Sequence, residues 1–131
     1  MEPANIADAV HLWKILYNKY CQCHSFPNFT ADGLLTVKTY LKDQIDKGNA
    51  IIATENGEMI GYMAWMCIDF HTERTAFLPI VGHAASFNEE IRIYNEMYYY
   101  ASQKWGLDDR FNHLWMTFYD DKNLLYNLYD I

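Results

Sequence analysis

One histidine of this chain stands where a catalytic base could act. His83 follows Gly82 directly, after an apolar segment whose residues are compatible with an extended strand. An imidazole titrates near neutral pH, so His83 could take a proton from an amine as a general base. The alternative is a loop histidine that hydrogen-bonds a backbone carbonyl. The sequence leaves both roles open.

Three further groups could carry chemistry but have simpler interpretations. Cys21–His24 offers two or three zinc ligands, but the chain has no second Cys/His pair at metal spacing, and a structural zinc needs about four ligands. Asp108-Asp109 and Asp120-Asp121 could hold a cation, although acids beside a turn and at a helix start are usually solvated caps. The side chains of Tyr98–Tyr100 point about 100° apart on a helix, which excludes one flat platform. We expect Tyr98 in the core and Tyr100 at an interface.

The composition is typical of one globular domain spanning residues 1–131. With 51% hydrophobic residues, 6 Gly and 3 Pro, it is far from a disordered composition. The 10 basic and 17 acidic residues give a net charge of −7, which argues against nucleic acid as a partner. The chain has neither a glycine-rich nucleotide-binding motif nor a nucleophile elbow. We therefore do not expect a nucleotide-binding enzyme or a serine or cysteine hydrolase.

The same composition predicts location and redox state. No stretch approaches the ~20 apolar residues of a membrane-spanning helix, and the N-terminus lacks the pattern of a signal peptide. We therefore expect a cytoplasmic location and no membrane partner. The 3 cysteines form an odd set, so a disulfide framework is not expected. Cys67 lies in an apolar stretch, where we expect it to behave as a small hydrophobe.

The first third of the chain predicts two helices. Large apolar residues recur at three-and-four spacing from Ile6 to Tyr20, which is typical of one helix face. Residues 21–29 are predicted to be irregular because Pro27 disfavours helix before it, and Thr30 can cap a second helix. This helix should end near Lys47-Gly48, since glycine tolerates the left-handed conformation. Its predicted inward residues are Leu34, Leu41 and Ile45.

A hairpin follows around Asn56-Gly57, which is the strongest short hairpin signal because both turn positions need positive φ. Its strands are expected at 50–55 and 58–68. The second strand is apolar on both alternations, so it should be central and covered by helices on both faces.

A third strand and a third helix are expected next. The strand should run from Arg74 to Val81, with Pro79 marking a missing ladder donor. Ser86 and Glu89 form the pattern of a capping box, ahead of a helix that ends near Trp105-Gly106. Two apolar stripes are predicted on this helix: a core stripe of Ile91, Tyr94, Tyr98, Ala101 and Trp105, and a second stripe of Ile93, Met97 and Tyr100.

The remaining chain predicts a fourth strand at 112–119 and a last amphipathic helix opened by Asp120-Asp121. The element order is then ααβββαβα, with the helix after the third strand as a crossover. The expected class is α/β, a mixed sheet with helices on both faces.

Four segments carry a resemblance to a known family: GNAIIATENGEMIGYMAWM, LPIVGHAAS, the helix ending ASQKWG, and HLWMTFYDD running into NLLYNLYDI. Together with the element order, which covers residues 6 to 131, they resemble the GNAT superfamily of N-acetyltransferases. The chain looks most like the N-terminal half of a tandem GNAT-like protein. The resemblance implies acetyl transfer from acetyl-CoA to a small amine, with acetyl-CoA between the splayed fourth and fifth strands of the family.

The resemblance also implies site residues. Backbone groups of Leu78 and Ile80 would position the pantetheine arm of acetyl-CoA. His83 is then the best available base for the attacking amine. Tyr126 or Tyr129 would protonate the thiolate that leaves.

Two departures from the family pattern support a second hypothesis. Counted back from the glycine after the third helix, the pyrophosphate turn falls on 87–92, which contains no glycine. Glu89 and Glu90 instead place carboxylates at the positive end of the helix, with Arg92 as the compensating cation. Compared with the family pattern, the sixth and seventh strands are missing, so we expect either a C-terminal truncation or a partner that covers the aromatic strand.

The alternative function is therefore a non-catalytic module of the same fold. Such a module would form a homodimer or pair with a second GNAT-like domain. We expect the aromatic strand and the stripe of Ile93, Met97 and Tyr100 to form its contact surface.

Overall fold

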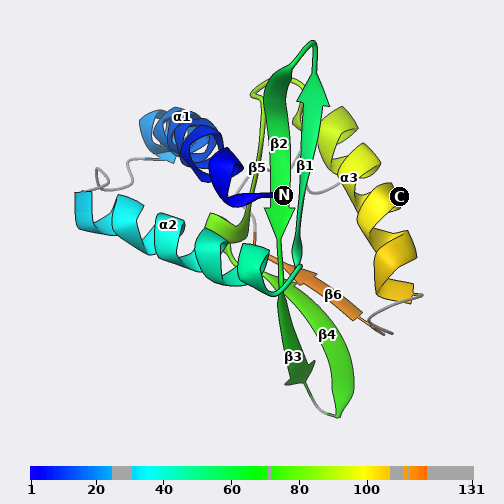
Figure 1. Ribbon diagram of the computed structural model, residues 1–131. Coiled ribbons are helices and arrows are strands. Elements are labelled where there is room, and N and C mark those ends of the chain that lie inside the picture. Colours follow the sequence, from blue (N-terminus) through cyan, green and yellow to red (C-terminus); the bar gives the residue numbers. More distant parts are fainter. Residues whose placement is uncertain (25–30, 71, 107–110, 112, 118–131) are drawn as a thin grey trace.

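The computed structural model describes residues 1–24, 31–70, 72–106, 111 and 113–117, with 21–24, 31–32 and 70 described by their backbone alone. The strands form two three-stranded sheets, ordered β1-β2-β5 and β3-β4-β6 (Figure 1). The elements are η1 (Pro3–Asn5), α1 (Ile6–His24), α2 (Ala31–Asp46), β1 (Ala50–Glu55), β2 (Glu58–Ala64), β3 (Met66–Phe70), β4 (Glu73–Leu78), η2 (Ile80–Gly82), β5 (His83–Ala85), α3 (Glu90–Lys104) and β6 (His113–Met116).

Helices cover both faces of the first sheet. α1 and α2 lie on one face and α3 lies on the other (Figure 1). Side chains of β2 alternate between the two resulting cores: Tyr62 and Ala64 pack with α1 and α2, whereas Met63 packs with α3. The prediction of a central strand that is apolar on both alternations is confirmed. In the described part of the chain, no helix has the length and apolar character needed to cross a bilayer.

Both N-terminal helices lie where the sequence predicts them. α1 begins at Ile6 but continues to His24, so the expectation of an irregular segment from 21 is wrong for 21–24. Pro27 disfavours helix only at the residue before it, and nothing earlier in the segment breaks the helix. α2 buries Leu41 completely and packs Leu34 and Ile45 against the same core, as predicted.

The end of α2 forms a Schellman motif around Gly48. Gly48 has φ +74°, its N–H donates to the Ile45 carbonyl at 3.0 Å, and the Asn49 N–H donates to the Gln44 carbonyl at 2.9 Å. The motif confirms the predicted end of this helix. It also brings Gln44 and Asn49 to the same corner of the fold.

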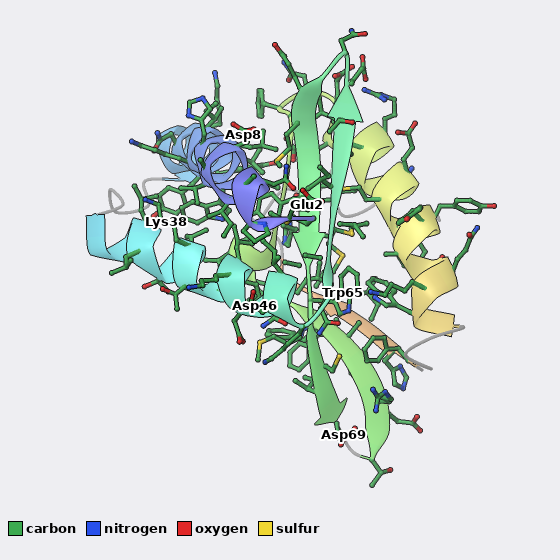
Figure 2. All side chains as sticks on the ribbon, in the orientation of Figure 1. Glu2, Asp8, Lys38, Asp46, Trp65 and Asp69 are labelled. Atoms are coloured by element: carbon green, nitrogen blue, oxygen red, sulfur yellow. The ribbon has the colours of Figure 1, made fainter. Side chains whose placement is uncertain are left out.

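The hairpin is confirmed, but its second strand is divided. Asn56 and Gly57 have φ of 54° and 81°, as the turn requires. The predicted strand at 58–68 is wrong in one respect, because the chain leaves the first sheet at Trp65 and enters the second as β3. Trp65 is fully buried, and its ring meets Trp105 edge-on at 5.3 Å, beside α3 (Figure 2). A large side chain on the α3 face therefore marks the change of sheet.

The predicted third strand is also divided. β4 ends at Leu78 because Pro79 has no N–H to continue the ladder. Ile80 and Val81, expected in the strand, lie in a 3₁₀ turn closed by a hydrogen bond from Gly82 N–H to the Pro79 carbonyl at 2.8 Å. The chain then resumes as β5, which pairs antiparallel with β2.

The start of α3 differs from the predicted capping box. The helix begins at Glu90, and the N-cap residue Glu89 makes no side-chain cap. The Ser86 carbonyl, rather than its hydroxyl, accepts from the Glu89 N–H at 3.1 Å. Asn88 takes φ 73° in this turn, a conformation that asparagine tolerates better than most residues. The turn therefore occupies the residues that the capping box would have used.

The buried face of α3 is rotated relative to the predicted core stripe. Its buried apolar residues are Ile93, Tyr94, Met97 and Ala101, followed by Trp105 at the C-cap. Ile91, predicted as core, is 37% exposed. Because Ile93 and Met97 are in the core, the second stripe is not a contact surface, although Tyr100 is 65% exposed.

β6 lies parallel to β4 and takes the place of the predicted fourth strand. The predicted helix opened by Asp120-Asp121 lies outside the described residues, as do Tyr126 and Tyr129. The described elements form the α/β fold with helices on both faces that the sequence predicts.

Candidate functional site at the junction of β5 and β6

Two neighbouring strands part at Leu78. β4 and β6 run side by side up to the pair Leu78 and Met116, and the Thr117 N–H still donates to the Leu78 carbonyl at 3.0 Å. Beyond this point the 3₁₀ turn carries the chain to β5, which belongs to the other sheet. We call this place the β5/β6 junction and define it by Leu78, His83, Tyr94 and Thr117.

His83 spans the junction with its imidazole. The side chain is 2% exposed, with Nε2 at 2.6 Å from the Thr117 carbonyl oxygen and Nδ1 at 2.7 Å from the Tyr94 hydroxyl. A carbonyl can only accept, so Nε2 carries the proton, Nδ1 of the neutral ring accepts, and the Tyr94 hydroxyl donates. Burial lowers the pKa of His83 to about 4, and the hydrogen bond to Thr117 opposes this shift. The imidazole is therefore neutral at pH 7 and ties β5 to α3 and to the end of β6.

The carbonyls of the turn between β4 and β5 are engaged inside the protein. The Leu78 carbonyl accepts from Thr117, and the Ile80 carbonyl accepts from Trp13 Nε1 at 3.0 Å. The Val81 carbonyl accepts from the Tyr62 hydroxyl at 2.8 Å. In this arrangement the carbonyls of both residues predicted to position a pantetheine arm are already hydrogen-bonded.

The start of α3 holds a buried carboxylate. Glu90 is 8% exposed, and its Oε2 accepts from the Tyr20 hydroxyl of α1 at 2.9 Å. Next to this contact, the Lys19 ammonium lies 5.4 Å from the centre of the Phe87 ring. A carboxylate is favoured at this end of a helix by the helix dipole. The Tyr20 hydroxyl thus holds the Glu90 carboxylate at the start of α3, while Phe87, Asn88 and Glu89 of the preceding turn stay exposed.

Arg92 does not take part in the contact between Tyr20 and Glu90. Its guanidinium forms ion pairs with Glu55 at 3.1 Å, with Glu89 at 3.4 Å and with Glu96 at 3.7 Å. The cation predicted to compensate the acidic turn is therefore shared among a carboxylate at the end of β1, one at the N-cap of α3 and one within α3.

The structure brings together some predicted residues and separates others. Leu78 and His83 are both hydrogen-bonded to the backbone of Thr117 at the junction. The Ile80 carbonyl accepts from Trp13 instead, and Arg92 takes part in neither contact. The sequence analysis placed Tyr20 and Tyr94 on the apolar faces of their helices but assigned neither of them, nor Thr117, to this site. Their hydrogen bonds were missed because long-range partners leave no local pattern.

The described residues hold no group of three or more His, Cys, Asp or Glu side chains placed to bind a metal ion. The side chains of Cys21–His24, which the sequence offers as zinc ligands, are not among those that the structure describes. Cys67 is exposed rather than part of the core, so the expectation that it behaves as a small hydrophobe is wrong.

Comparison with known proteins identifies the fold. An aminoglycoside N-acetyltransferase, AAC(6')-Iy in complex with CoA, is 14% identical with a TM-score of 0.65, covering 99% of this chain and 81% of that protein. A predicted acetyltransferase with acetyl-CoA from Clostridium acetobutylicum is 12% identical with a TM-score of 0.70, covering 100% and 86%. A tetramutant of the BH1408 protein from Bacillus halodurans is 7% identical with a TM-score of 0.69, covering 99% and 87%.

No model of a known protein family matches the sequence, and no curated protein matches it. The structural likeness at these identities establishes the fold. This chain has the fold of the GNAT acetyltransferases, as the four sequence segments and the element order predicted.

Proposed function

We propose that this chain serves acetyl transfer from acetyl-CoA to a small amine, as a domain with the GNAT acetyltransferase fold. The supporting observation is the likeness, over 99% and 100% of the chain, to acetyltransferase structures that hold CoA and acetyl-CoA respectively. Beyond Leu78 the chain leaves its neighbour β6 and continues in the other sheet as β5, and this divergence is the feature at which the family resemblance expects the cofactor. Acetyl-CoA would supply an acetyl group activated as a thioester.

The start of α3 does not fit the pyrophosphate of this cofactor. A pyrophosphate needs bare amides and positive potential at a helix N-terminus. Here Glu90 supplies a buried carboxylate that is hydrogen-bonded to Tyr20, and Glu89 adds a second negative charge. The acidic pair predicted from the sequence therefore stands where the phosphate groups would lie.

His83 stays the predicted base of this proposal. The lone pair of Nδ1 is held by the Tyr94 hydroxyl, so the ring can accept a proton from an amine only after this hydrogen bond breaks. Tyr126 or Tyr129 stays the predicted acid.

A second candidate function is a non-catalytic module that pairs with a second copy or with a catalytic domain. The buried Glu90 carboxylate favours the non-catalytic module, because it disfavours a phosphate group at the start of α3. So does a row of side chains across the second sheet, where the exposed Met66 and Trp115 flank the partly buried Phe77 on adjacent strands. Met66 is 37% and Trp115 47% exposed, and the Phe77 and Trp115 rings meet at 5.2 Å. Such a surface supports a partner on this sheet.

Calorimetric titration with acetyl-CoA tests the proposal and separates the two candidates. The native chain is compared with a Glu89→Gly, Glu90→Gly variant, which restores bare backbone and removes both charges. A Glu89→Gln, Glu90→Gln variant serves as the matched control, because it removes the charges without adding glycine.

Micromolar binding by the native chain would support a domain that binds acetyl-CoA itself. It would contradict the argument that Glu89 and Glu90 exclude the pyrophosphate. Binding gained only by the glycine variant would support the non-catalytic module. Failure of all three proteins to bind would overturn acetyl transfer by this domain.

A further inference from the structure

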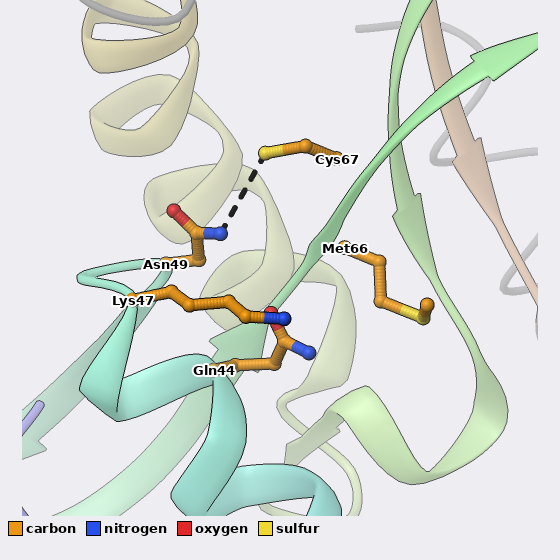
Figure 3. Close-up of a pocket in the computed structure, with 5 residues that line it drawn as sticks. All are labelled: Gln44, Lys47, Asn49, Met66 and Cys67. Atoms are coloured by element: carbon orange, nitrogen blue, oxygen red, sulfur yellow. Dashed lines mark hydrogen bonds between the residues drawn. The ribbon is translucent and has the colours of Figure 1, made fainter.

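A pocket of about 330 Å³ lies where the end of α2 meets β3. It is lined by Gln44, Lys47, Asn49, Met66 and Cys67 (Figure 3). None of these residues belongs to β5, α3 or β6. An inference about this pocket therefore stands independently of the proposed acetyl transfer.

The backbone of the pocket is set by two hydrogen bonds. The Schellman motif joins Gln44 and Asn49 through their main chains, and the Asn49 carbonyl accepts from the Trp65 N–H at 3.0 Å. The first bond closes the end of α2, and the second holds that end against the residue where the chain changes sheets. The two side-chain amides thus project from a rigid corner beside Met66 and Cys67.

Gln44 offers the pocket a hydrogen-bond acceptor without a partner. The residue is 1% exposed, and its Oε1 has no hydrogen-bond partner. Asp43 Oδ2 accepts from both Gln44 Nε2 at 3.3 Å and Lys47 Nζ at 3.0 Å. Because a carboxylate only accepts, the amide nitrogen of Gln44 must be the atom that faces Asp43, which leaves the oxygen unpaired. A buried carbonyl in this state is stabilised by any ligand that brings an N–H to it.

Asn49 offers a donor to the same pocket. The residue is 8% exposed, and its Nδ2 points to Cys67 Sγ at 3.6 Å (Figure 3). Sulfur is a weak acceptor, so this amide gains from a carbonyl oxygen in its place. The charge of Lys47 is balanced by its ion pair with Asp43, so the pocket does not favour an anionic ligand. Met66 adds apolar surface that suits an alkyl group.

We propose that this pocket binds a small, neutral secondary carboxamide. The ligand N–H donates to Gln44 Oε1, the ligand carbonyl accepts from Asn49 Nδ2, and its alkyl group packs against Met66. One amide group supplies the donor and the acceptor on two separate atoms, which matches two complementary side chains on one corner. A bound ligand also covers the Cys67 thiol, which provides a readout.

Binding is measured by the rate at which N-ethylmaleimide alkylates Cys67. Peptide mass spectrometry follows this reaction, so that Cys67 is distinguished from the other two cysteines. The probe is N-butylacetamide, compared with N-butyl-N-methylacetamide, which has no N–H. At about four times its Kd the secondary amide should slow alkylation about fivefold, since only the free pocket reacts. The tertiary amide should not slow it.

Gln44→Met removes the acceptor at similar volume and should abolish the protection. Gln103→Met, an exposed glutamine of α3, is the matched control and should retain it. Equal protection by both amides, no protection by either, or protection that survives in Gln44→Met would each overturn the proposal. If Gln44→Met does not fold, the comparison of the two amides on the native protein still tests the proposal.

Discussion

At the β5/β6 junction both ring nitrogens of His83 are hydrogen-bonded, and nearby the buried Glu90 carboxylate accepts from Tyr20. In the pocket at the end of α2, Gln44 Oε1 is equally buried and has no partner. Protein interiors rarely leave polar atoms unpaired, because each costs about 1 to 3 kcal/mol. At the junction the buried polar side chains thus pair with one another, whereas the pocket keeps unused hydrogen-bonding capacity.

The largest expected effect is a pH dependence of stability from His83. Burial lowers its pKa from 6.5 to about 4 in the folded protein. The unfolded chain therefore takes up a proton near pH 6.5, while the folded protein does so only near pH 4. Stability is lost as pH falls through this window, by up to about 3 kcal/mol. Urea unfolding at several pH values measures it.

The control for this prediction is the pair His83→Gln and His11→Gln. The first should flatten the pH dependence between pH 6.5 and 4 relative to the native chain, while the second, at an exposed histidine, should not. Identical slopes in all three proteins would show that His83 is not held neutral at the junction.

Tyr20→Phe should destabilise the protein by about 2 kcal/mol, because it removes a donor from a buried carboxylate. Tyr99→Phe, at a tyrosine that is 70% exposed, is the matched control and should change little. Thermal unfolding of both variants measures the difference. An equal, small effect of the two substitutions would mean that the bond between Tyr20 and Glu90 does not hold this carboxylate at the start of α3.

Gln44→Met should stabilise the ligand-free protein by about 1 kcal/mol, since an apolar side chain of similar volume leaves no unpaired oxygen. The weak 3.3 Å contact with Asp43 is lost in exchange. Chemical unfolding beside Gln103→Met provides the measurement and its control. A loss of stability in Gln44→Met alone would contradict the assignment of unused capacity to this pocket.

The smallest expected effect belongs to Arg92→Met. The three ion pairs of Arg92 are exposed to solvent, where salt screens them and side-chain entropy opposes them. Thermal unfolding at physiological salt should not separate this variant from the native chain. A large loss would indicate that Arg92 organises the start of α3, which would bring it into the junction.

Much of the fold follows from local patterns. Asn56-Gly57 predicts the hairpin because its φ requirements are local, and Gly48 predicts the end of α2 for the same reason. The division of the predicted strand at Trp65 did not follow, since leaving one sheet for another depends on which strands pair. Likewise, the pattern of Ser86 and Glu89 could not reveal that a turn at Asn88 delays the helix start to Glu90.

The sequence by itself determined the α/β class, the two N-terminal helices, the hairpin and the acidic start of α3, because these depend on residues near one another in the chain. Only the tertiary structure decided the partners of the chemical groups. His83 meets Thr117 across 34 residues, and Tyr20 meets Glu90 across 70. Such contacts arise when packed elements bring distant residues together. They hold the predicted base His83 neutral, with both ring nitrogens hydrogen-bonded, and they pair the buried Glu90 carboxylate with Tyr20.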